Sequence, residues 1–363
     1  MTLNSALATE PHWVSAPGST VRKLMESRGL TWESLADALE LSDPQLRRLI
    51  NGELTITSSL ANKLAGALGS TAHFWESRES NYRESMSLLA ADQLAQDSPM
   101  EYMVQKGWIE GTTEWAARAR SLLAFYGVNT TDEWVRTWSS RLKEANFRTS
   151  PTFESHDLSV SAWLRCAEIK ANQLNLSAWS PSGVRAVLPP LRRLSLLSNP
   201  QKFVPQAQAL LASAGVALVI LPATPENRLS GAAFVAHDQR RVIGLTGRHL
   251  SEDHFWFTLF HEIGHLLLHG DAGDFLDTMD PADADSLVEH EANEHARSIL
   301  IPSGLGTLSE GRLTTRRVVA FAASQGISPG LVVGQLHHAK IIRYNQMQYL
   351  IRRYRWDGAM LKI

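Results

Sequence analysis

The chain has 363 residues, of which 44% are hydrophobic and 20% are charged, and its formal net charge is −2 at pH 7. This length exceeds one ordinary hydrophobic core, so we expect two or three domains, and the balanced charge gives no overall electrostatic reason to bind nucleic acid. The single cysteine, Cys166, excludes an intramolecular disulfide and a cysteine-based metal site, which fits a reducing cytoplasm.

The N-terminal residues 1–18 contain Ser, Pro and Gly without a periodic apolar pattern, so we expect a flexible arm. They lack the basic start and the apolar run of a signal peptide. Stretches of about 18 apolar residues do not occur in the sequence, so we expect no membrane span and a cytoplasmic protein.

Residues 19–86 are expected to form a small all-α domain. Their apolar residues recur at spacings typical of amphipathic helices, and short breaks at residues 28–29, 40–42 and 51–52 divide them into several helices. Within this domain, residues 31–52 have the spacing of a helix-turn-helix, whose second helix would enter the major groove of DNA.

Four polar residues around the start of that second helix are predicted to contact DNA. Ser42 can cap the helix, Gln45 can hydrogen-bond to adenine, and Arg47 and Arg48 can contact guanine or phosphate. Acidic residues slightly outnumber basic ones over residues 20–60, so we expect weak binding by one copy and a homodimer. A structural helical bundle or a protein-docking domain is the alternative interpretation of this segment.

Residues 87–200 keep a mostly helical pattern and are expected to form a helical linker domain. Candidate breaks lie at residues 127–129, 149–151, 180–181 and 189–190, where Gly, Ser or Pro interrupt the pattern. Cys166 lies in one of these predicted helices and is expected to be a small buried core residue rather than a catalytic thiol.

The pattern changes within residues 201–305, which are expected to form an α+β domain. Residues 216–221 form an apolar run typical of a buried strand, and residues 232–235 and 241–245 flank a short turn and predict a hairpin. The segment 232–235 is expected either to complete a small sheet or to present its edge to an extended substrate.

A long apolar helix is predicted to begin near Ser251 or Asp253, either of which can cap it, and to contain the sequence His261-Glu262-Ile263-Gly264-His265. Histidines four residues apart project from one face of a helix and can bind one Zn²⁺, and the glutamate between them can take a proton from the attacking water. The sequence therefore predicts a zincin-type peptidase site, with His261 and His265 as metal ligands and Glu262 as the catalytic base.

The third metal ligand is expected on the helix that follows, within residues 286–300. A metzincin-type third histidine is excluded, because Leu268 and Asp271 stand where that pattern requires glycine and histidine. Glu291 is the preferred ligand, because the small residues Ala292 and Ala296 mark the face that can approach the first helix. The alternatives left open are Glu289, Glu294 and His295.

Other polar residues near the motif have weaker assignments. His269 is expected to lie at a helix end rather than on the metal, and the acidic residues 271–285 lack the spacing of a calcium loop and predict a solvated connector. The residue that stabilises the oxyanion is not determined by the sequence; the candidates are His295, His337, His338 and Tyr344. Residues 306–363 are expected to form a C-terminal helical extension.

Two segments resemble known families. Residues 19–86 resemble an XRE-type helix-turn-helix of the HigA antitoxin kind, through Leu35-Ala36, Leu41-Ser42, Arg48-Leu49-Ile50-Asn51-Gly52 and Phe74-Trp75. Residues 215–302 resemble an ImmA/IrrE-family metallopeptidase, through residues 253–265 and the sequence Glu291-Ala292-Asn293-Glu294-His295-Ala296. His295 replaces the aromatic residue usual in that family, and Asp43-Pro44 replaces the polar pair common at the start of the recognition helix.

The resemblance implies a mainly α fold with a small β-sheet: an N-terminal all-α helix-turn-helix domain, a helical middle and a zincin-like, gluzincin-type α+β domain. It also implies a Zn²⁺ cofactor and a protein substrate. The expected function is a DNA-associated regulatory zinc endopeptidase that cleaves a partner repressor or antitoxin-like protein in a bacterial or phage stress response. The alternatives are a transcriptional regulator or antitoxin whose peptidase-like domain senses without cleaving, and a protein that cleaves itself between residues 86 and 200.

Overall fold

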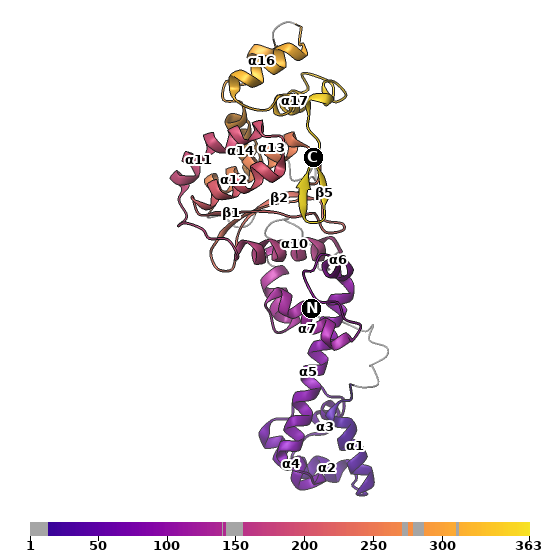
Figure 1. The fold of residues 1–363 in the computed structure, drawn as a ribbon. Helices are drawn as coiled ribbons and strands as arrows, with labels where there is room; N and C mark the ends of the chain where they lie inside the picture. Colours follow the sequence, from indigo (N-terminus) through magenta and orange to yellow (C-terminus); the bar gives the residue numbers. More distant parts are fainter. Residues whose placement is uncertain (1–13, 140, 143–154, 271–274, 279–286, 310–311) are drawn as a thin grey trace. The chain divides into compact units, whose positions relative to one another are not determined.

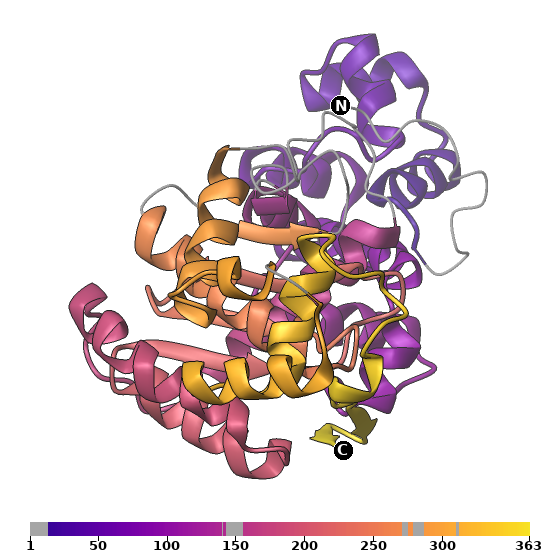
Figure 2. The same ribbon diagram turned by 90° about the horizontal axis from the view of Figure 1, so that it is seen from above.

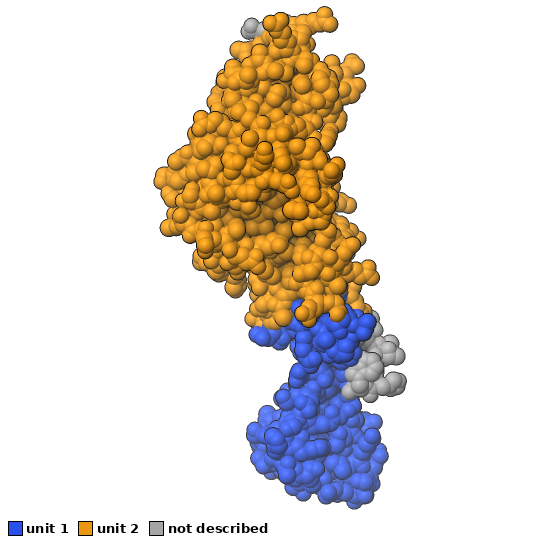
Figure 3. Space-filling view, in the orientation of Figure 1, with its two compact units in different colours: residues 1–95, 112–123, 129–131 blue, residues 96–111, 124–128, 132–363 orange. Residues whose placement is uncertain are grey.

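The computed structural model describes residues 14–139, 141–142, 155–270, 275–278, 287–309 and 312–363 (Figure 1). Its mainly helical composition with small sheets confirms the expected fold class. Contacts between residues divide the chain into two compact units, coloured separately in Figure 3 and described in turn below. Unit 1 comprises residues 1–95, 112–123 and 129–131, and unit 2 comprises residues 96–111, 124–128 and 132–363.

Unit 1 contains a bundle of short helices that continue into one long helix. The helices are α1 (Pro17–Ser27), α2 (Trp32–Leu39), α3 (Asp43–Ile50), α4 (Ser58–Leu68) and most of α5 (Ala72–Asp97). Their core is formed by buried apolar side chains, among them Leu35, Leu39, Leu46, Leu49, Leu64 and Trp75. The arm expected over residues 1–18 ends earlier, since Pro17 and Gly18 belong to α1, and residues 1–13 lie outside the described part.

Local sequence explains where these helices begin and how closely they pack. Thr31 and Thr57 precede α2 and α4, and their side chains accept hydrogen bonds from the backbone N–H groups three residues later. Gly18 lies against α3 so closely that a Cβ atom there would be 2.1 Å from the Ile50 carbonyl oxygen. The uninterrupted helix α5 crosses residue 86, where we expected the first domain to end.

The helical part of unit 2 precedes its sheet. In chain order the structure has α6 (Met100–Gln105), α7 (Trp115–Tyr126, shared with unit 1), α8 (Thr131–Trp134), a π-helix (Val135–Ser139), α10 (Ser155–Ala171), α11 (Pro181–Arg193), a 3₁₀ turn (Leu194–Leu196) and α12 (Pro200–Ala212). The break expected at residues 189–190 is wrong, because α11 continues through both prolines and changes to the 3₁₀ turn only at Leu194. The break expected at residues 149–151 lies outside the described residues.

The strands β1 (Val216–Ile220), β2 (Leu229–Val235), β3 (Arg241–Leu245) and β4 (Phe275–Thr278) form a sheet in the order β1-β3-β2-β4. The pair β1 and β3 is parallel, whereas β2 is antiparallel to both β3 and β4. The predicted strand and hairpin are thus confirmed. Of the two alternatives for residues 232–235, the structure supports the one in which they complete the sheet, because β2 lies between β3 and β4 and β4 forms the edge.

Helices cover both faces of this sheet. The helix α10 lies on one face, where a Cβ atom on Gly244 would be 2.5 Å from the Trp163 ring. The helices α12 and α13 (Glu252–Leu268) pack on the other face, as Figures 1 and 2 show. The sheet therefore presents α13, which carries the predicted metal ligands, to the helix α14 (Leu287–Leu300) above it.

The C-terminal part of the chain completes the core above the sheet. It contains α15 (Gly306–Ser309), α16 (Thr315–Gln325), α17 (Pro329–His338), a 3₁₀ turn (Gln348–Leu350) and a hairpin of β5 (Arg355–Asp357) and β6 (Met360–Lys362). Among the described residues, no single helix is long and apolar enough to cross a membrane; α16 and α17 meet the length and composition only as a pair bent by 110°.

Candidate functional site

The start of α13 is held by a buried carboxylate. Glu252 is fully buried, and its two oxygens accept hydrogen bonds from the Arg352 backbone N–H at 3.0 Å and the Ser328 hydroxyl at 2.8 Å. Ser251 occupies the N-cap position with an extended backbone, although its side chain makes no capping hydrogen bond. The helix that carries the motif is therefore fixed at its beginning by residues distant in the sequence.

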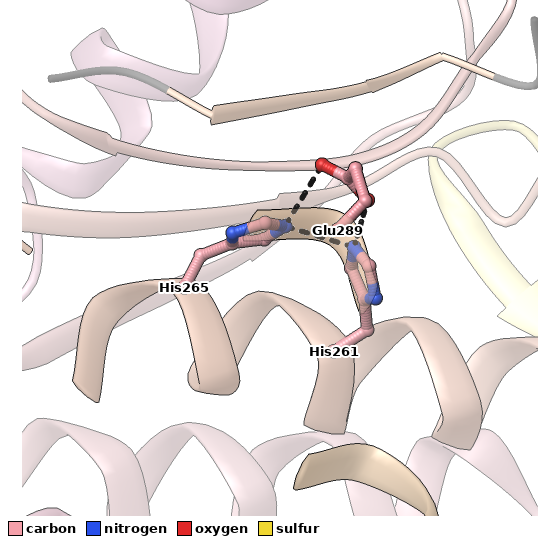
Figure 4. A group of neighbouring side chains, drawn as sticks. All are labelled: His261, His265 and Glu289. Atoms are coloured by element: carbon pink, nitrogen blue, oxygen red, sulfur yellow. Dashed lines mark hydrogen bonds and ion pairs between the residues drawn. The ribbon is translucent and has the colours of Figure 1, made fainter. Parts of the chain in front are cut away.

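The two motif histidines are buried and face each other. His261 is 3% exposed and His265 is fully buried, and their Nε2 atoms lie 2.9 Å apart (Figure 4). This arrangement follows from the spacing of four residues, which stacks side chains on one face of a helix. The structure therefore brings together the two predicted histidine ligands.

Glu289 of α14 completes this group. Its carboxylate oxygens lie 3.2 Å from His261 Nε2 and 3.3 Å from His265 Nε2, and Figure 4 shows the three side chains pointing toward one another. Among the described residues, His261, His265 and Glu289 form the one group of three side chains able to bind a metal whose ligand atoms lie within 4.8 Å of one another. We call these three residues the ligand group.

The donor atoms fit a zinc ion in kind and in spacing. Two imidazole nitrogens and one carboxylate are the ligands of gluzincin-type catalytic zinc sites, which keep a fourth position for water. Ligands about 2.0–2.1 Å from a tetrahedral ion lie about 3.3 Å from one another, close to the separations seen here. His261, His265 and Glu289 are thus the residues that would hold Zn²⁺.

The preference for Glu291 as third ligand is corrected by this geometry. Its carboxylate instead contacts His269 Nε2 at 2.8 Å. Ala292 does face α13, as expected, but the acidic residue on the same face of α14 is the one three positions earlier, Glu289. The residue directly before Ala292 is turned by about 100° around the helix axis.

The other two alternatives have different contacts. Glu294 forms an ion pair with Arg297 on its own helix. His295 lies against Gly264, where a Cβ atom would be 3.2 Å from both His295 Nδ1 and the Ala292 Cα. Glycine inside the motif therefore lets α14 approach α13 closely enough for Glu289 to reach the histidines.

Asn293 contacts one of the motif histidines and was not predicted from the sequence. Its Oδ1 lies 3.1 Å from His261 Nδ1. An Nδ1–H that donates to this oxygen leaves the lone pair of a neutral ring on Nε2, the atom that faces the ligand group. The spacing of four residues from Glu289 was the available signal, because it places both side chains on one face of α14.

Burial and mutual contact set the charges of the group. Burial lowers the pKa of His265, which favours the neutral imidazole that a metal requires. Burial alone would raise the pKa of Glu289, but the contacts with His261 and His265 outweigh it and lower this pKa to about 2. The site therefore presents an ionised carboxylate beside a neutral ring.

Glu262, the predicted base, is fully buried between α13 and the sheet. A Cβ atom on Gly231 of β2 would be 2.5 Å from Glu262 Oε1 and 2.7 Å from Thr258 Cγ2. Glycine at this position of the strand therefore leaves the space in which the Glu262 carboxylate lies.

The predicted DNA-binding residues lie at the start of α3 and contact one another. Gln45 Oε1 accepts hydrogen bonds from the backbone N–H and the hydroxyl of Ser42, both at 2.9 Å.

The two predicted arginines form ion pairs at the surface. Arg47 pairs with Asp43 at 2.9 Å, and its guanidinium lies 5.3 Å from the centre of the Trp32 ring. Arg48 lies 4.0 Å from Glu53. Both arginine side chains remain more than half exposed, so their ion pairs are screened by solvent and weak.

Comparison with sequence families finds two matches. Residues 21–75 match the helix-turn-helix family, and residues 212–312 match the IrrE N-terminal-like domain. The chain combines a helix-turn-helix with an IrrE-like domain. Both resemblances expected from the sequence are thereby confirmed, and they describe a DNA-binding regulator with a peptidase-like domain. A search of curated proteins found no match to the chain.

The IrrE-like match includes α13, α14 and all four strands of the large sheet. Its edge strand β4 lies in the segment 271–285, which we expected to be only a solvated connector. Most of the acidic residues of that segment lie outside the described part. The helix-turn-helix match includes α2 and α3, which agrees with the predicted segment 31–52.

The candidates for an oxyanion-stabilising residue lie in different places. His337, His338 and Tyr344 line one cavity beside Phe257, whose ring centre lies 6.2 Å from that of His261. His295 instead packs against Gly264. Three of the four candidates therefore lie near the ligand group along α13, on the side toward its N-terminus.

Proposed function

We propose that this protein is a regulatory zinc endopeptidase that cleaves a partner repressor or antitoxin-like protein. The observation that carries the proposal is the convergence of His261, His265 and Glu289, with Glu262 on the same buried helix. The match to the IrrE N-terminal-like domain supports the same chemistry. The helix-turn-helix supports a role at DNA, which fits a protein of the cytoplasm. The proposed place in bacterial or phage stress responses rests on the family resemblance alone.

The chemistry is hydrolysis of a peptide bond. Zinc bound by the three side chains would polarise the substrate carbonyl and lower the pKa of the attacking water. Glu262 accepts one proton of that water as the oxygen forms its bond to the carbonyl carbon, and then donates the proton to the departing amine as the C–N bond breaks. Asn293 holds the His261 ring in position throughout.

The helix-turn-helix would bring the peptidase to DNA. We propose that Ser42 and Gln45 fix the start of α3, while Arg47 and Arg48 contact the DNA. One copy offers few free positive charges, because Arg47 is paired with Asp43, so we expect a homodimer to be the binding form.

Substitution of Glu262 by glutamine tests the proposal. The purified protein and its Glu262→Gln variant are analysed for zinc by mass spectrometry and incubated with peptides from candidate regulators. We expect both proteins to bind zinc and the unmodified protein alone to cleave. Zinc binding with no cleavage of any regulator would favour the alternative of a regulator or antitoxin whose peptidase-like domain only senses. Cleavage of the chain itself between residues 86 and 200 would favour self-processing.

A further inference from the structure

A cavity of about 210 Å³ lies beside α13 in unit 2, between this helix and the residues of α17 and the segment after it. Its lining includes Asp253, His254 and Phe257 from α13, and His337, His338 and Tyr344 from the C-terminal part of the chain. A cavity of about 150 Å³ already holds benzene, so this one has room for a long amino-acid side chain.

The cavity lies in line with the ligand group. Asp253, Phe257, His261 and His265 follow one another at intervals of four residues and therefore share one face of α13. The Phe257 ring lies 6.2 Å from that of His261 and 6.1 Å from that of His338, so it stands between the ligand group and the cavity. A substrate whose cleaved bond lies at the ligand atoms would pass the cavity opening.

The distance along the helix suits a side chain close to the cleaved bond. Eight residues separate Asp253 from His261, a rise of about 12 Å. An extended peptide places side chains on one side about every 7 Å. A long side chain one or two residues from the cleaved bond can therefore span the distance to Asp253.

The charge of the cavity wall indicates which type of substrate side chain the cavity can bind. Asp253 makes no hydrogen bond or ion pair with any residue in the described part of the chain, and its Oδ1 is buried. The nearby basic groups have other contacts: Arg297 pairs with Glu294 and lies 3.4 Å from the His338 ring, and Arg353 bonds to the Gln348 side chain. Lys340 is exposed to solvent.

Most of the remaining wall is aromatic, with Gly334 and Gln335 beside the rings. Burial lowers the pKa of His254 and of His338, which keeps both imidazoles neutral near pH 7. Together with the rings of Phe257 and Tyr344, they offer faces over which a cation is attracted. One unpaired carboxylate with ring walls fits a guanidinium or an ammonium group better than an acidic or a small apolar group.

We infer that this cavity is the subsite for a lysine or arginine side chain of the substrate, with Asp253 as the residue that determines its specificity. The inference rests on the proposed peptidase function, since it names one feature of the protein that is cleaved. It goes beyond that function because it predicts a basic residue within one or two positions of the cleaved bond.

Peptide binding to the zinc-loaded Glu262→Gln protein tests the inference without requiring turnover. The probes are fluorescently labelled eight-residue peptides of mixed sequence, with one fixed position occupied by arginine, uncharged citrulline or glutamate. We expect arginine at one position to improve the dissociation constant about tenfold over citrulline, an effect typical of a partly buried charge pair. The Asp253→Asn substitution should abolish this preference, and Asp253→Lys should transfer it to glutamate.

Two further variants control for structural damage. Tyr344 is 66% exposed, so Tyr344→Ala leaves the fold intact and should weaken binding of the arginine peptide alone. Asp357→Asn removes an exposed carboxylate that pairs with Lys362, far along the chain from the cavity, and should change nothing.

The outcomes separate the subsite from the proposed function. If the unmodified protein cleaves peptides with no preference for a basic residue, the subsite is wrong and the peptidase stands. If the preference survives Asp253→Asn, the assignment of Asp253 is wrong. If the protein binds neither zinc nor any peptide, both proposals are wrong.

Discussion

The group of His261, His265 and Glu289 and the start of α3 both bring ionisable side chains together, but the first group is buried and the second lies at the surface. On α13 and α14, the polar atoms of His261, His265 and Glu289 meet in a buried place. Their lone pairs face one another, and a proton or a cation between them is needed to offset the repulsion. On α3, the polar groups of Arg47 and Asp43 pair with each other at the surface. We propose that a cation from outside the chain completes the first group, whereas the groups of the second already pair with each other.

The largest effect should come from the ligand group itself. We expect His261→Ala and Glu289→Gln to weaken zinc binding more than about 100-fold, since even residues that only support a ligand contribute up to about that factor. Glu291→Gln is the matched control, because its carboxylate contacts His269 instead. Competition with a coloured chelator measures the affinity. Equal losses in the two glutamate variants would contradict the assignment of Glu289.

The contrast between Glu289 and Glu291 also shows which parts of the site can be predicted from the sequence. The motif was sufficient to predict His261, Glu262 and His265 as site residues. Two histidines four residues apart on a buried apolar helix lie on one face, and few other interpretations explain them. Which acidic side chain reaches the histidines depends on the rotation of α14 about its axis, and the small residues Ala292 and Ala296 did not distinguish Glu289 from Glu291, two positions later. The edge strand β4 was missed since its acidic surroundings have no strand pattern, and its pairing with β2 is a tertiary contact.

A smaller loss of zinc binding is expected from Asn293→Ala. The substitution removes the oxygen that holds His261 Nδ1, so the ring can rotate or bind its proton on the wrong nitrogen, and affinity should fall about 10- to 100-fold. Asn293→Asp keeps an acceptor and should restore most of the affinity. The same chelator competition measures both variants, and an Asn293→Ala protein with unchanged affinity would exclude a positioning role.

The space that Gly231 leaves for the Glu262 side chain allows a test of Glu262 that keeps His261, His265 and Glu289 unchanged. Gly231→Ala puts a Cβ atom 2.5 Å from Glu262 Oε1, so the carboxylate or the strand must move, at a cost of about 1–3 kcal/mol in unfolding free energy. Zinc binding should persist while peptide cleavage falls. Urea denaturation and zinc analysis of the same sample check both statements; full cleavage by this variant would show that Glu262 is not confined by the strand.

On α3, the comparison predicts a gain rather than a loss. Asp43→Asn removes the carboxylate that pairs with Arg47 and leaves the guanidinium available to phosphate or guanine. DNA affinity should rise by no more than about tenfold at moderate salt, because one charge contact is gained. Fluorescence anisotropy with a random-sequence duplex at two salt concentrations measures the change. Weaker binding by this variant would mean that Asp43 holds Arg47 in its DNA-binding position.

The smallest effect contrasts a second glycine with Gly231. Gly66 lies within α4, and a Cβ atom there would meet no other atom within 4 Å. Alanine costs less conformational entropy than glycine in a helix, so Gly66→Ala should stabilise unit 1 by about 0.5–1 kcal/mol. Thermal unfolding followed by circular dichroism measures this gain. Since the same substitution destabilises at Gly231, the opposite signs would show that glycine serves close packing at the metal centre and has no such role in α4. A loss of stability at both positions would remove that distinction.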